Sequence, residues 1–414
     1  MVEVVRYTYR LRPGARAERA LVAEWHRCRW LWNEAVHQQK SGRRPTLCKL
    51  SKLLTQTRAR SAWLREGSQV AQQQTLRTYA HALSAAYQVK GRGKPVIKHR
   101  KRALPSLEYT RRGFRLHDRR LCLPRGVIIP VVWSRELPSA PSSVRVYQDN
   151  LGHWYASFVV SRQTRAAPEA CGGIGIDWGV STVAATTDPA YDLPYAGYRK
   201  RCTASLAQTQ RRMARRRRPR GQAQSNGYRR AKREAAKIQQ KAARQDTHAA
   251  RVWARRVVDH HRLIAVEDFR PRFLAKSTMA RKAADSAIGT AKRELIERGV
   301  RAGRTVVLVP PACTTMTCSE CGEKQARLGL AERTFQCPGC GYTAGRDRNA
   351  ATVILATAER GRAGADDVRH SLASFPDASA VRSEPQIPQR QRGESLNTEY
   401  HSHHLSLVRQ EYLS

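Results

Sequence analysis

Residues 317–351 read TCSECGEKQARLGLAERTFQCPGCGYTAGRDRNAA, in which two CxxC pairs precede a charged helix start. Each pair places two thiolates on one side of a tight turn, and two such turns close a tetrahedral zinc site with Zn–S distances of about 2.3 Å. Gly322 and Gly341 follow the second cysteine of each pair, where the turn favours a residue that tolerates positive φ. We expect a structural Zn²⁺ here, since four protein ligands leave no open position. The predicted ligands are Cys318, Cys321, Cys337 and Cys340.

Three carboxylates stand beside apolar segments. Asp347 follows the second cysteine pair at the start of a predicted helix, where it could also be a helix cap. Asp177 lies in GIDWGV, residues 175–180, and Glu267 ends the apolar run LIAVE, residues 263–267. A carboxylate in an apolar strand is costly to bury unless it binds a cation or finds hydrogen-bond donors. Three carboxylates at the ends of α/β elements can hold two Mg²⁺ or Mn²⁺ ions about 4 Å apart for phosphodiester hydrolysis. We therefore predict that these three residues bind magnesium and are catalytic.

The charge of the chain points to a polyanionic partner. The sequence has 76 Lys and Arg against 33 Asp and Glu, a formal net charge of +43. Such a charge opposes compaction unless a polyanion offsets it, and nucleic acid is the obvious one. The run RRMARRRR at residues 211–218 concentrates this charge, because consecutive arginines repel one another unless phosphates lie between them. The alternative interpretation is that this arginine run is a solvated helix face. We predict nucleic-acid contacts for Arg215, Arg216, Arg217 and Arg218.

The N-terminal part of the chain combines strands and helices. Apolar residues alternate with basic ones over residues 5–11, and short alternating segments separated by turns recur between residues 105 and 160. Helical periodicity lies between them, at about residues 16–90. We expect residues 1–165 to form a small β-barrel with this helical insert.

Strands and helices then alternate over residues 172–312, which indicates an α/β domain. It contains a long basic helical hairpin at residues 203–260. We assign residues 313–344 to the zinc ribbon and residues 345–360 to a last helix that carries the third carboxylate. Residues 361–414 lose periodicity and gain Ser, Pro, Gln and His, which predicts a disordered tail.

The sequence shows no sign of a membrane partner. No run approaches the roughly 18 apolar residues of a membrane span, and the N-terminal MVEVVR lacks the order of a signal peptide. We expect a cytoplasmic protein without disulfides. The cysteines outside the two pairs are expected to be small buried side chains. They are Cys28, Cys48, Cys122, Cys171, Cys202 and Cys313.

Together, the Asp177, Glu267 and Asp347 motifs and the cysteine ribbon resemble the split RuvC domain of the transposon-associated TnpB (OrfB) family. That family shares ancestry with the compact type V CRISPR effectors. The resemblance runs over most of residues 1–358. Further motifs that carry it are YRLRP at 9–13, WLWNEA at 30–35, QQQTLR at 72–77 and RGKP at 92–95. Gly345 departs from the family, which has an acidic residue at this position.

The resemblance implies an RNase H-like (RuvC) nuclease domain with an inserted zinc ribbon, and an N-terminal wedge barrel with a helical recognition insert. It also implies a prokaryotic, nucleoid-associated enzyme that carries a guide RNA and cleaves double-stranded DNA beside a short flanking motif. By position, it makes Asp177, Glu267 and Asp347 the metal-binding catalytic residues. Glutamine can bond adenine bidentately in the major groove. The candidates for contacting the flanking duplex are therefore Gln73 and Gln74, with Gln72, beside the basic turn at Arg92 and Lys94.

Other functions remain open at this point. A compact type V CRISPR effector would differ only in the source of its guide, which lies outside this chain. An RNA-guided repressor that binds without cleaving would have no need of three carboxylates, and neither would a zinc-ribbon transcription factor. A DNA-strand transferase would need a tyrosine or serine recombinase constellation, which the sequence does not offer.

Overall fold

The computed structural model describes residues 2–43, 45–89, 91–100, 102–163, 168–219, 221–268, 287–326, 329 and 332–363. The predicted disordered tail lies outside the described residues from residue 364 onward. Within the predicted α/β domain of residues 172–312, residues 220 and 269–286 lie outside the described residues. None of the described helices is both long and apolar enough to cross a membrane.

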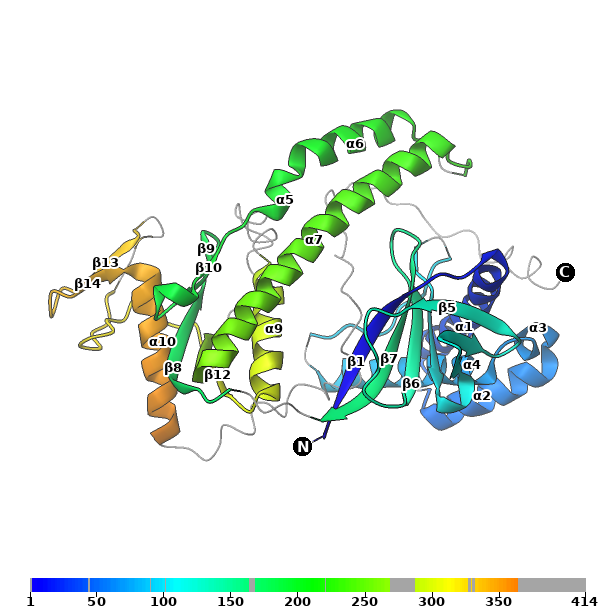
Figure 1. The fold of residues 1–414 in the computed structure, drawn as a ribbon, viewed down its shortest axis with the longest axis horizontal. Coiled ribbons are helices and arrows are strands. Elements are labelled where there is room, and N and C mark those ends of the chain that lie inside the picture. Colours follow the sequence, from blue (N-terminus) through cyan, green and yellow to red (C-terminus); the bar gives the residue numbers. More distant parts are fainter. Residues whose placement is uncertain are drawn as a thin grey trace.

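The N-terminal half is built on a seven-stranded antiparallel sheet in the order β2-β6-β7-β1-β5-β4-β3 (Figure 1). β1 pairs with β7 along its whole length, whereas it pairs with β5 at two positions only. The strands are β1 (Val2–Leu11), β2 (Ser106–Thr110), β3 (Arg115–His117), β4 (Arg120–Leu123), β5 (Val127–Val132), β6 (Ser143–Gln148) and β7 (Trp154–Gln163).

This sheet is a curled, open half-barrel, where the sequence pattern favoured a small β-barrel or sandwich. β2 and β3 are its two edges among the described strands. β3 and β4 contain three and four residues, so they offer few backbone hydrogen bonds with which to close a ring. Two helices pack on the sheet in place of further strands. They contribute Leu21, Trp25 and Cys28 from α1 and Ala71 from α4 to the sheet's core.

Four helices form the insert: α1 (Ala15–Lys40), α2 (Leu47–Arg60), α3 (Ala62–Arg65) and α4 (Gln69–Gln88). All four fall in the predicted helical insert at about residues 16–90. The side chains of Thr46, Ser61 and Ser68 cap the last three of these helices. Leu50 of α2 and Leu64 of α3 enter a second apolar core with α1 and α4, which explains why these short basic segments become helical.

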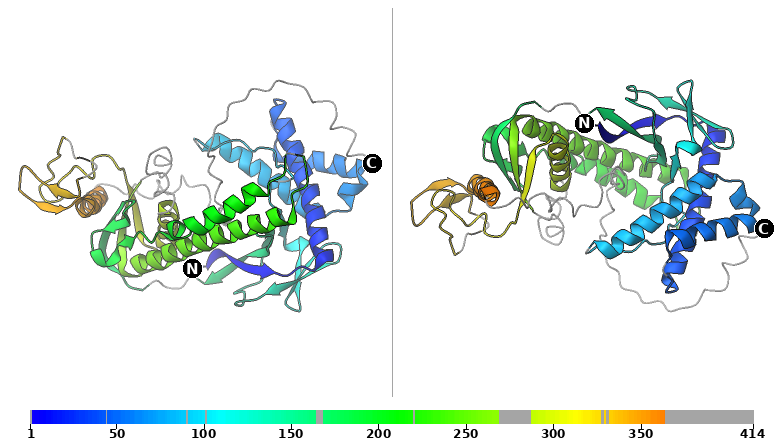
Figure 2. Two further views of the ribbon diagram at one scale, coloured as in Figure 1. Left: turned by 90° about the horizontal axis from the view of Figure 1, so that it is seen from above. Right: turned by 90° about the horizontal axis from the view of Figure 1, so that it is seen from below.

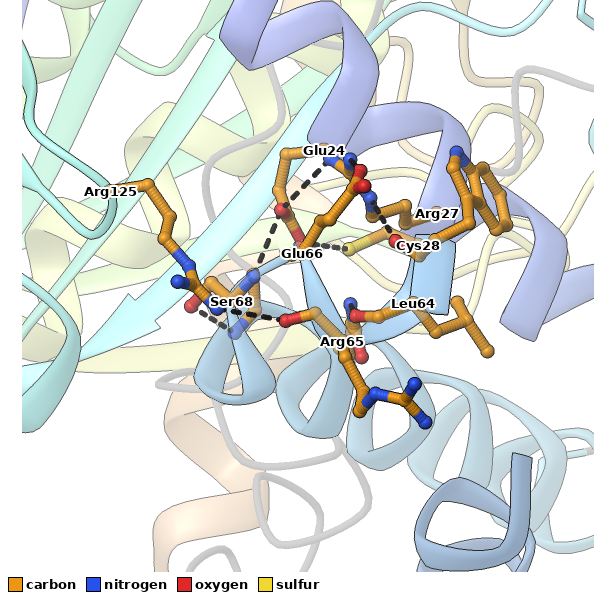
Figure 3. Close-up of polar contacts among 12 residues, drawn as sticks. Glu24, Arg27, Cys28, Leu64, Arg65, Glu66, Ser68 and Arg125 are labelled. Carbon is orange, nitrogen blue, oxygen red and sulfur yellow. Dashed lines mark hydrogen bonds and ion pairs between the residues drawn. The ribbon is translucent and has the colours of Figure 1, made fainter. Parts of the chain in front are cut away.

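A buried polar junction joins α1 to the turn between α3 and α4 (Figure 3). Glu24 accepts a hydrogen bond from the backbone N–H of Ser68 at 3.0 Å, and Arg27 pairs with Glu66 at 2.9 Å. Burial raises the pKa of Glu24, against the opposing effects of the Ser68 bond and the Arg27 charge. The junction therefore fixes the start of α4 relative to α1.

The C-terminal half contains a five-stranded mixed sheet in the order β10-β9-β8-β11-β12. β8 is antiparallel to β9 and parallel to β11, which is parallel to β12. The strands are β8 (Cys171–Trp178), β9 (Thr182–Thr186), β10 (Leu193–Pro194), β11 (His261–Glu267) and β12 (Thr305–Val309).

Helices cover both faces of the mixed sheet because its inner strands are apolar on both sides. Ile264 and Val266 face α7 (Asn226–His260) and α9 (Ile288–Arg301), whereas Ala265 between them packs with α10 (Arg346–Ala363). Figure 1 shows α10 and α9 on either side of this sheet.

A helical hairpin of α6 (Thr203–Arg215) and α7, preceded by the short α5 (Tyr198–Arg201), extends from the mixed sheet toward the half-barrel (Figures 1 and 2). Two hydrogen bonds connect it to the half-barrel. Gln240 donates to Asp149 at 3.0 Å, and Arg244 donates to the hydroxyl of Tyr155 at 3.4 Å. α7 is thus a direct link between the two halves.

Candidate active site and metal centre

Asp177 and Glu267 lie side by side at the C-terminal ends of two inner strands of the mixed sheet. They belong to the neighbouring parallel strands β8 and β11, in which Ile176 is paired with Val266, so the next residue of each strand reaches the same edge. Both are buried, with 6% and 7% of their surface exposed. Each carboxyl group alters the pKa of the other, as expected for groups in close proximity. The strand register thus brings together two of the three predicted carboxylates.

Asp347 reaches the same place from the first turn of α10. That helix begins at Arg346, so Asp347 lies inside it and is not its cap. Gly175 lets α10 approach β8 closely, because a Cβ added at Gly175 would lie 1.9 Å from the carbonyl oxygen of Ala351. Ala351 is one helical turn beyond Asp347. The missing side chain at Gly175 therefore allows the third carboxylate to approach Asp177.

The carboxylates interact strongly with one another. Burial raises the pKa of Asp177 well above its ordinary value, and the negative charges of Glu267 and Asp347 raise it further, while Arg346 opposes them. Burial also raises the pKa of Glu267, against the Trp178 backbone, the Asp177 hydrogen bond and the Lys292 charge. Ionisation of all the carboxylates at once is therefore unfavourable unless a cation binds them.

The four predicted cysteines form a cluster in the ribbon, beside the hairpin of β13 (Thr334–Gln336) and β14 (Thr343–Gly345). Their sulfurs all lie within 4.8 Å of one another. The Cys318–Cys340 and Cys321–Cys337 sulfur pairs are 3.7 Å and 3.5 Å apart. Four sulfurs around one zinc would lie about 3.8 Å apart, given the usual Zn–S distance.

The turns of the ribbon also match the prediction. Gly322 and Gly341 have φ of 77° and 74°, which glycine adopts without strain. Among the described residues, the four cysteines are the one group of three or more Cys, His, Asp or Glu side chains with such closely spaced ligand atoms. The donor set and its spacing fit Zn²⁺.

The other cysteines only partly follow the prediction that they are small buried side chains. Cys28 is fully buried, and burial raises the pKa of its thiol. Cys48 and Cys171 are exposed instead, and Cys122, Cys202 and Cys313 are half-buried.

The glutamines of α4 differ from one another. Gln72 is fully buried, where it accepts a hydrogen bond from Arg58 at 2.7 Å and donates one to the Leu64 carbonyl at 2.9 Å, so it is unavailable to DNA. Gln73 is exposed and Gln74 is half-buried. Both lie near the start of α4.

The basic turn follows the opposite end of α4, where Lys94 lies 5.2 Å from the ring centre of Tyr87. Arg92 is half-buried and Lys94 is exposed. Gln73 and Gln88 are separated by about 22 Å along the helix axis, from a rise of 1.5 Å per residue. The glutamines and the basic turn are therefore not adjacent, contrary to the expectation from the sequence.

The four arginines predicted to contact nucleic acid lie at the tip of the helical hairpin. Arg215 ends α6, and Arg216, Arg217 and Arg218 lie in the connection to α7. All four are exposed. Their visible contacts are to backbone oxygens, such as that of Arg216 with the Gly227 carbonyl at 3.4 Å. The tip is open to a ligand.

Sequence reasoning missed two residues next to Asp347. Arg348 forms a bidentate pair with Asp192, with both N–O distances at 3.0 Å. Asn349 is fully buried and contacts the ribbon. Both stand in the motif that identified Asp347, and their polar side chains in an otherwise apolar helix were the available signal.

Two sequence families match different parts of the chain. Residues 157–278 match the OrfB_IS605 family, described as "Probable transposase", and residues 289–354 match the Cas12f1-like TNB domain. A protein of Streptomyces pristinaespiralis, named as a candidate RNA-guided DNA endonuclease, is 29% identical over 78% of this chain and 80% of its own length. InsQ of Escherichia coli (strain K12), with the same description, is 25% identical over 84% of this chain and 91% of its own length.

The fold is similar to that of the protein in a cryo-EM structure of a Cas12f1–sgRNA–target DNA complex. The TM-score is 0.53 at 12% sequence identity, over 86% of this chain and 98% of that chain. At this identity the likeness concerns the fold alone. The two family matches and the relatives that run through most of the sequence agree with one another. The chain is therefore similar to the TnpB (OrfB) proteins over most of its length, and residues 289–354 match a Cas12f1-like TNB domain.

Proposed function

We propose that this chain is an RNA-guided DNA endonuclease that hydrolyses phosphodiester bonds at a RuvC-like site of RNase H-like fold. The observation that carries the proposal is the gathering of Asp177, Glu267 and Asp347 at one edge of the mixed sheet. These residues come from three segments far apart in the sequence. The names of the relatives from Streptomyces and Escherichia support the same activity.

The donor set fits Mg²⁺ or Mn²⁺, which favour carboxylate oxygens. The raised pKa of Asp177, caused by burial and by its acidic neighbours, marks a cluster whose ionised form needs a cation. Three carboxylates offer enough oxygen ligands for two such ions. When bound, such ions activate water and neutralise charge on the phosphodiester.

In this proposal each carboxylate has a defined support. Paired strands hold Asp177 and Glu267 in place, and both side chains are buried away from bulk water. Asp347 is 30% exposed, so it faces the side from which a DNA strand enters. Trp178 donates its indole N–H to the backbone carbonyl of Glu267 at 3.2 Å, which fixes the end of β11 against β8.

The basic surface holds the nucleic acids largely through their phosphates, and these contacts carry no sequence information. Sequence would be read by pairing between the bound guide RNA and one DNA strand. We assign Arg215, Arg216, Arg217 and Arg218 to backbone contacts, since all four are exposed. Gln73 and Gln74 remain our candidates for reading the flanking duplex. Arg92 and Lys94 would contact the backbone at a separate point.

A compact type V CRISPR effector would use the same site with a guide from another source. An RNA-guided repressor that binds DNA without cleaving it is the alternative from another class. The convergence of all three carboxylates on one site favours cleavage over that alternative.

The proposal is tested with protein purified together with its RNA and a plasmid library whose bases beside the target are randomised. With Mg²⁺, we expect cutting beside one short motif, and loss of cutting after RNase treatment or with EDTA. Cutting without RNA, or without any flanking preference, would leave a non-specific nuclease instead. Binding of the target without cutting in Mg²⁺ or Mn²⁺ would favour the repressor.

A further inference from the structure

We propose that Asn349 is a positioning residue that ties the zinc knuckle to Asp347, so that the ribbon sets the place of one carboxylate in the metal site. This inference rests on the proposed function, because it assumes that Asp347 acts in cleavage. It gives the ribbon a role in the nuclease site itself.

The side chain of Asn349 holds the backbone on both sides of a cysteine ligand. Its amide nitrogen donates to the carbonyl of Thr317 at 2.7 Å, and its amide oxygen accepts from the N–H of Ser319 at 2.9 Å. Cys318 lies between these two residues and is itself 2% exposed. One amide group thus hydrogen-bonds to the backbone on both sides of Cys318, whose sulfur belongs to the cysteine cluster.

The two hydrogen bonds of Asn349 are buried, and they lie close to Asp347 in the sequence. Asn349 has 0% of its surface exposed, so water cannot replace either hydrogen bond. It lies two residues after Asp347 on α10, within the same helical turn. A displacement of the knuckle is therefore passed to the first turn of the helix.

A second contact completes the arrangement on the other side of α10. Arg348 pairs bidentately with Asp192 and also donates to the carbonyl of Thr186. Thr186 ends β9, and the preceding residue, Ala185, is paired with Asp177. Asn349 and Arg348 thus hold the start of α10 between the ribbon and the hairpin that carries Asp177.

This arrangement predicts a specific defect in Asn349→Ala. We expect the Mg²⁺ concentration for half-maximal cleavage to rise about tenfold or more, the usual cost of losing an outer-sphere support of a metal ligand. The four thiolates remain, so zinc should stay at the wild-type stoichiometry. The affinity for target DNA in Ca²⁺ should change less than twofold.

Thr357→Ala is the matched control. Its hydroxyl bonds to the Val353 carbonyl of the same helix at 2.7 Å, far from Asp347 and from the ribbon. The Thr357→Ala variant should lose one hydrogen bond within α10. Its Mg²⁺ concentration for half-maximal cleavage should stay at the wild-type value. If both variants shift the Mg²⁺ dependence alike, the effect is general loosening of α10, and the positioning role is refuted.

Two further outcomes are decisive. Loss of zinc from Asn349→Ala would mean that the amide serves the folding of the ribbon, which would overturn the proposal. A wild-type Mg²⁺ dependence would overturn it too. The Asp347→Ala variant separates this failure from that of the proposed function: if Asp347→Ala abolishes cleavage while Asn349→Ala cleaves normally, only the positioning role is wrong.

Discussion

Gly175 decides how closely the first turn of α10 approaches Asp177. A Cβ at this position would lie 1.9 Å from the backbone oxygen of Ala351, and a backbone atom cannot swing aside as a side chain can. The helix must therefore move if Gly175 acquires a side chain. The motif at residues 175–180 thus supplies Asp177 and, through Gly175, the space that α10 needs to bring Asp347 near it.

We expect Gly175→Ala to lower the free energy of unfolding by about 2 kcal/mol through overpacking. We also expect cleavage to slow by about 10²-fold if Asp347 shifts by roughly 1 Å. Chemical denaturation and a single-turnover cleavage assay measure the two effects. Gly361→Ala, on the same helix in open space, is the control and should cleave normally. Normal cleavage by Gly175→Ala would show that the close approach is unnecessary.

At this scale the sequence pointed to the three carboxylates that the fold brings together, because an acid beside or inside an apolar strand is costly to bury without a partner. It could not predict the roles of Gly175, Arg348 or Asn349. Those roles depend on which segment packs against which, and the contacting residues are far apart in the sequence. Gln72 misled for the same reason, since its burial against α2 and α3 leaves no trace in the local pattern.

At the scale of elements, the β6–β7 turn binds α7 through one carboxylate. Asp149 accepts from the backbone N–H groups of Leu151 and His153, both at 2.9 Å, and from Gln240 at 3.0 Å. Burial alone would raise the pKa of Asp149, but these hydrogen bonds outweigh it, so its pKa is lowered. The ionised form therefore stabilises the joint between the two halves.

We expect Asp149→Ala to cost about 2 kcal/mol at neutral pH, a typical value for hydrogen bonds to a charged group. A pKa lowered in the folded state gives a stabilisation that is complete above the unfolded value of about 3.9 and is lost as pH falls through the folded value. The difference from wild type should therefore shrink below about pH 4 in thermal unfolding. Glu234→Ala, which removes an exposed ion pair with Arg212, should have little effect at any pH. A cost that does not change with pH would contradict this reasoning.

The ribbon is an element whose fold we expect to depend on a bound zinc ion. Its apolar core consists of Phe335, Cys318 and Cys337, with Tyr342 packed against them, which is too little to fold alone. We predict about one zinc per chain, and loss of both zinc and cleavage in Cys337→Ser. Elemental analysis and the cleavage assay measure these. Cys313→Ser, at the first residue of the ribbon but outside the four-cysteine cluster, should keep its zinc. Full cleavage by a zinc-free protein would refute the role of the ribbon.

At the scale of the whole molecule, charge and shape act together. The whole sequence carries a net charge of +43, α7 connects the two halves, and the tip of the α6–α7 hairpin lies above the half-barrel in Figure 1. Each phosphate contact releases counterions, so the salt dependence of binding reports how many contacts form.

Replacing Arg215, Arg216, Arg217 and Arg218 by Ala should weaken RNA binding and reduce the slope of log affinity against log salt by about 3. Filter binding at several salt concentrations measures the slope. The control is the pair Arg251→Ala and Arg255→Ala, whose charges are already neutralised by Glu294 and Asp259. An unchanged slope in the fourfold variant would show that the tip does not contact RNA.

The sequence indicated the main strands and helices correctly, because periodicity and cysteine spacing are local signals. That the sheet stays an open half-barrel was not predictable, since it depends on whether the edge strands β2 and β3 pair with each other. The contact of α7 with Asp149 was missed because a polar side chain on a long basic helix looks like any solvated residue.

The most direct test is to measure cleavage and target binding on the same preparations of Asp177→Ala, Glu267→Ala and Asp347→Ala, each with its RNA. In the proposed site the carboxylates hold metal rather than phosphate, so we expect each variant to bind its target with nearly wild-type affinity and to fail to cut it in Mg²⁺ or Mn²⁺. Asp259→Ala, which removes a carboxylate of α7 at the other end of β11, should bind and cut normally. Cutting by any one of the three variants at the wild-type rate would contradict the proposed site.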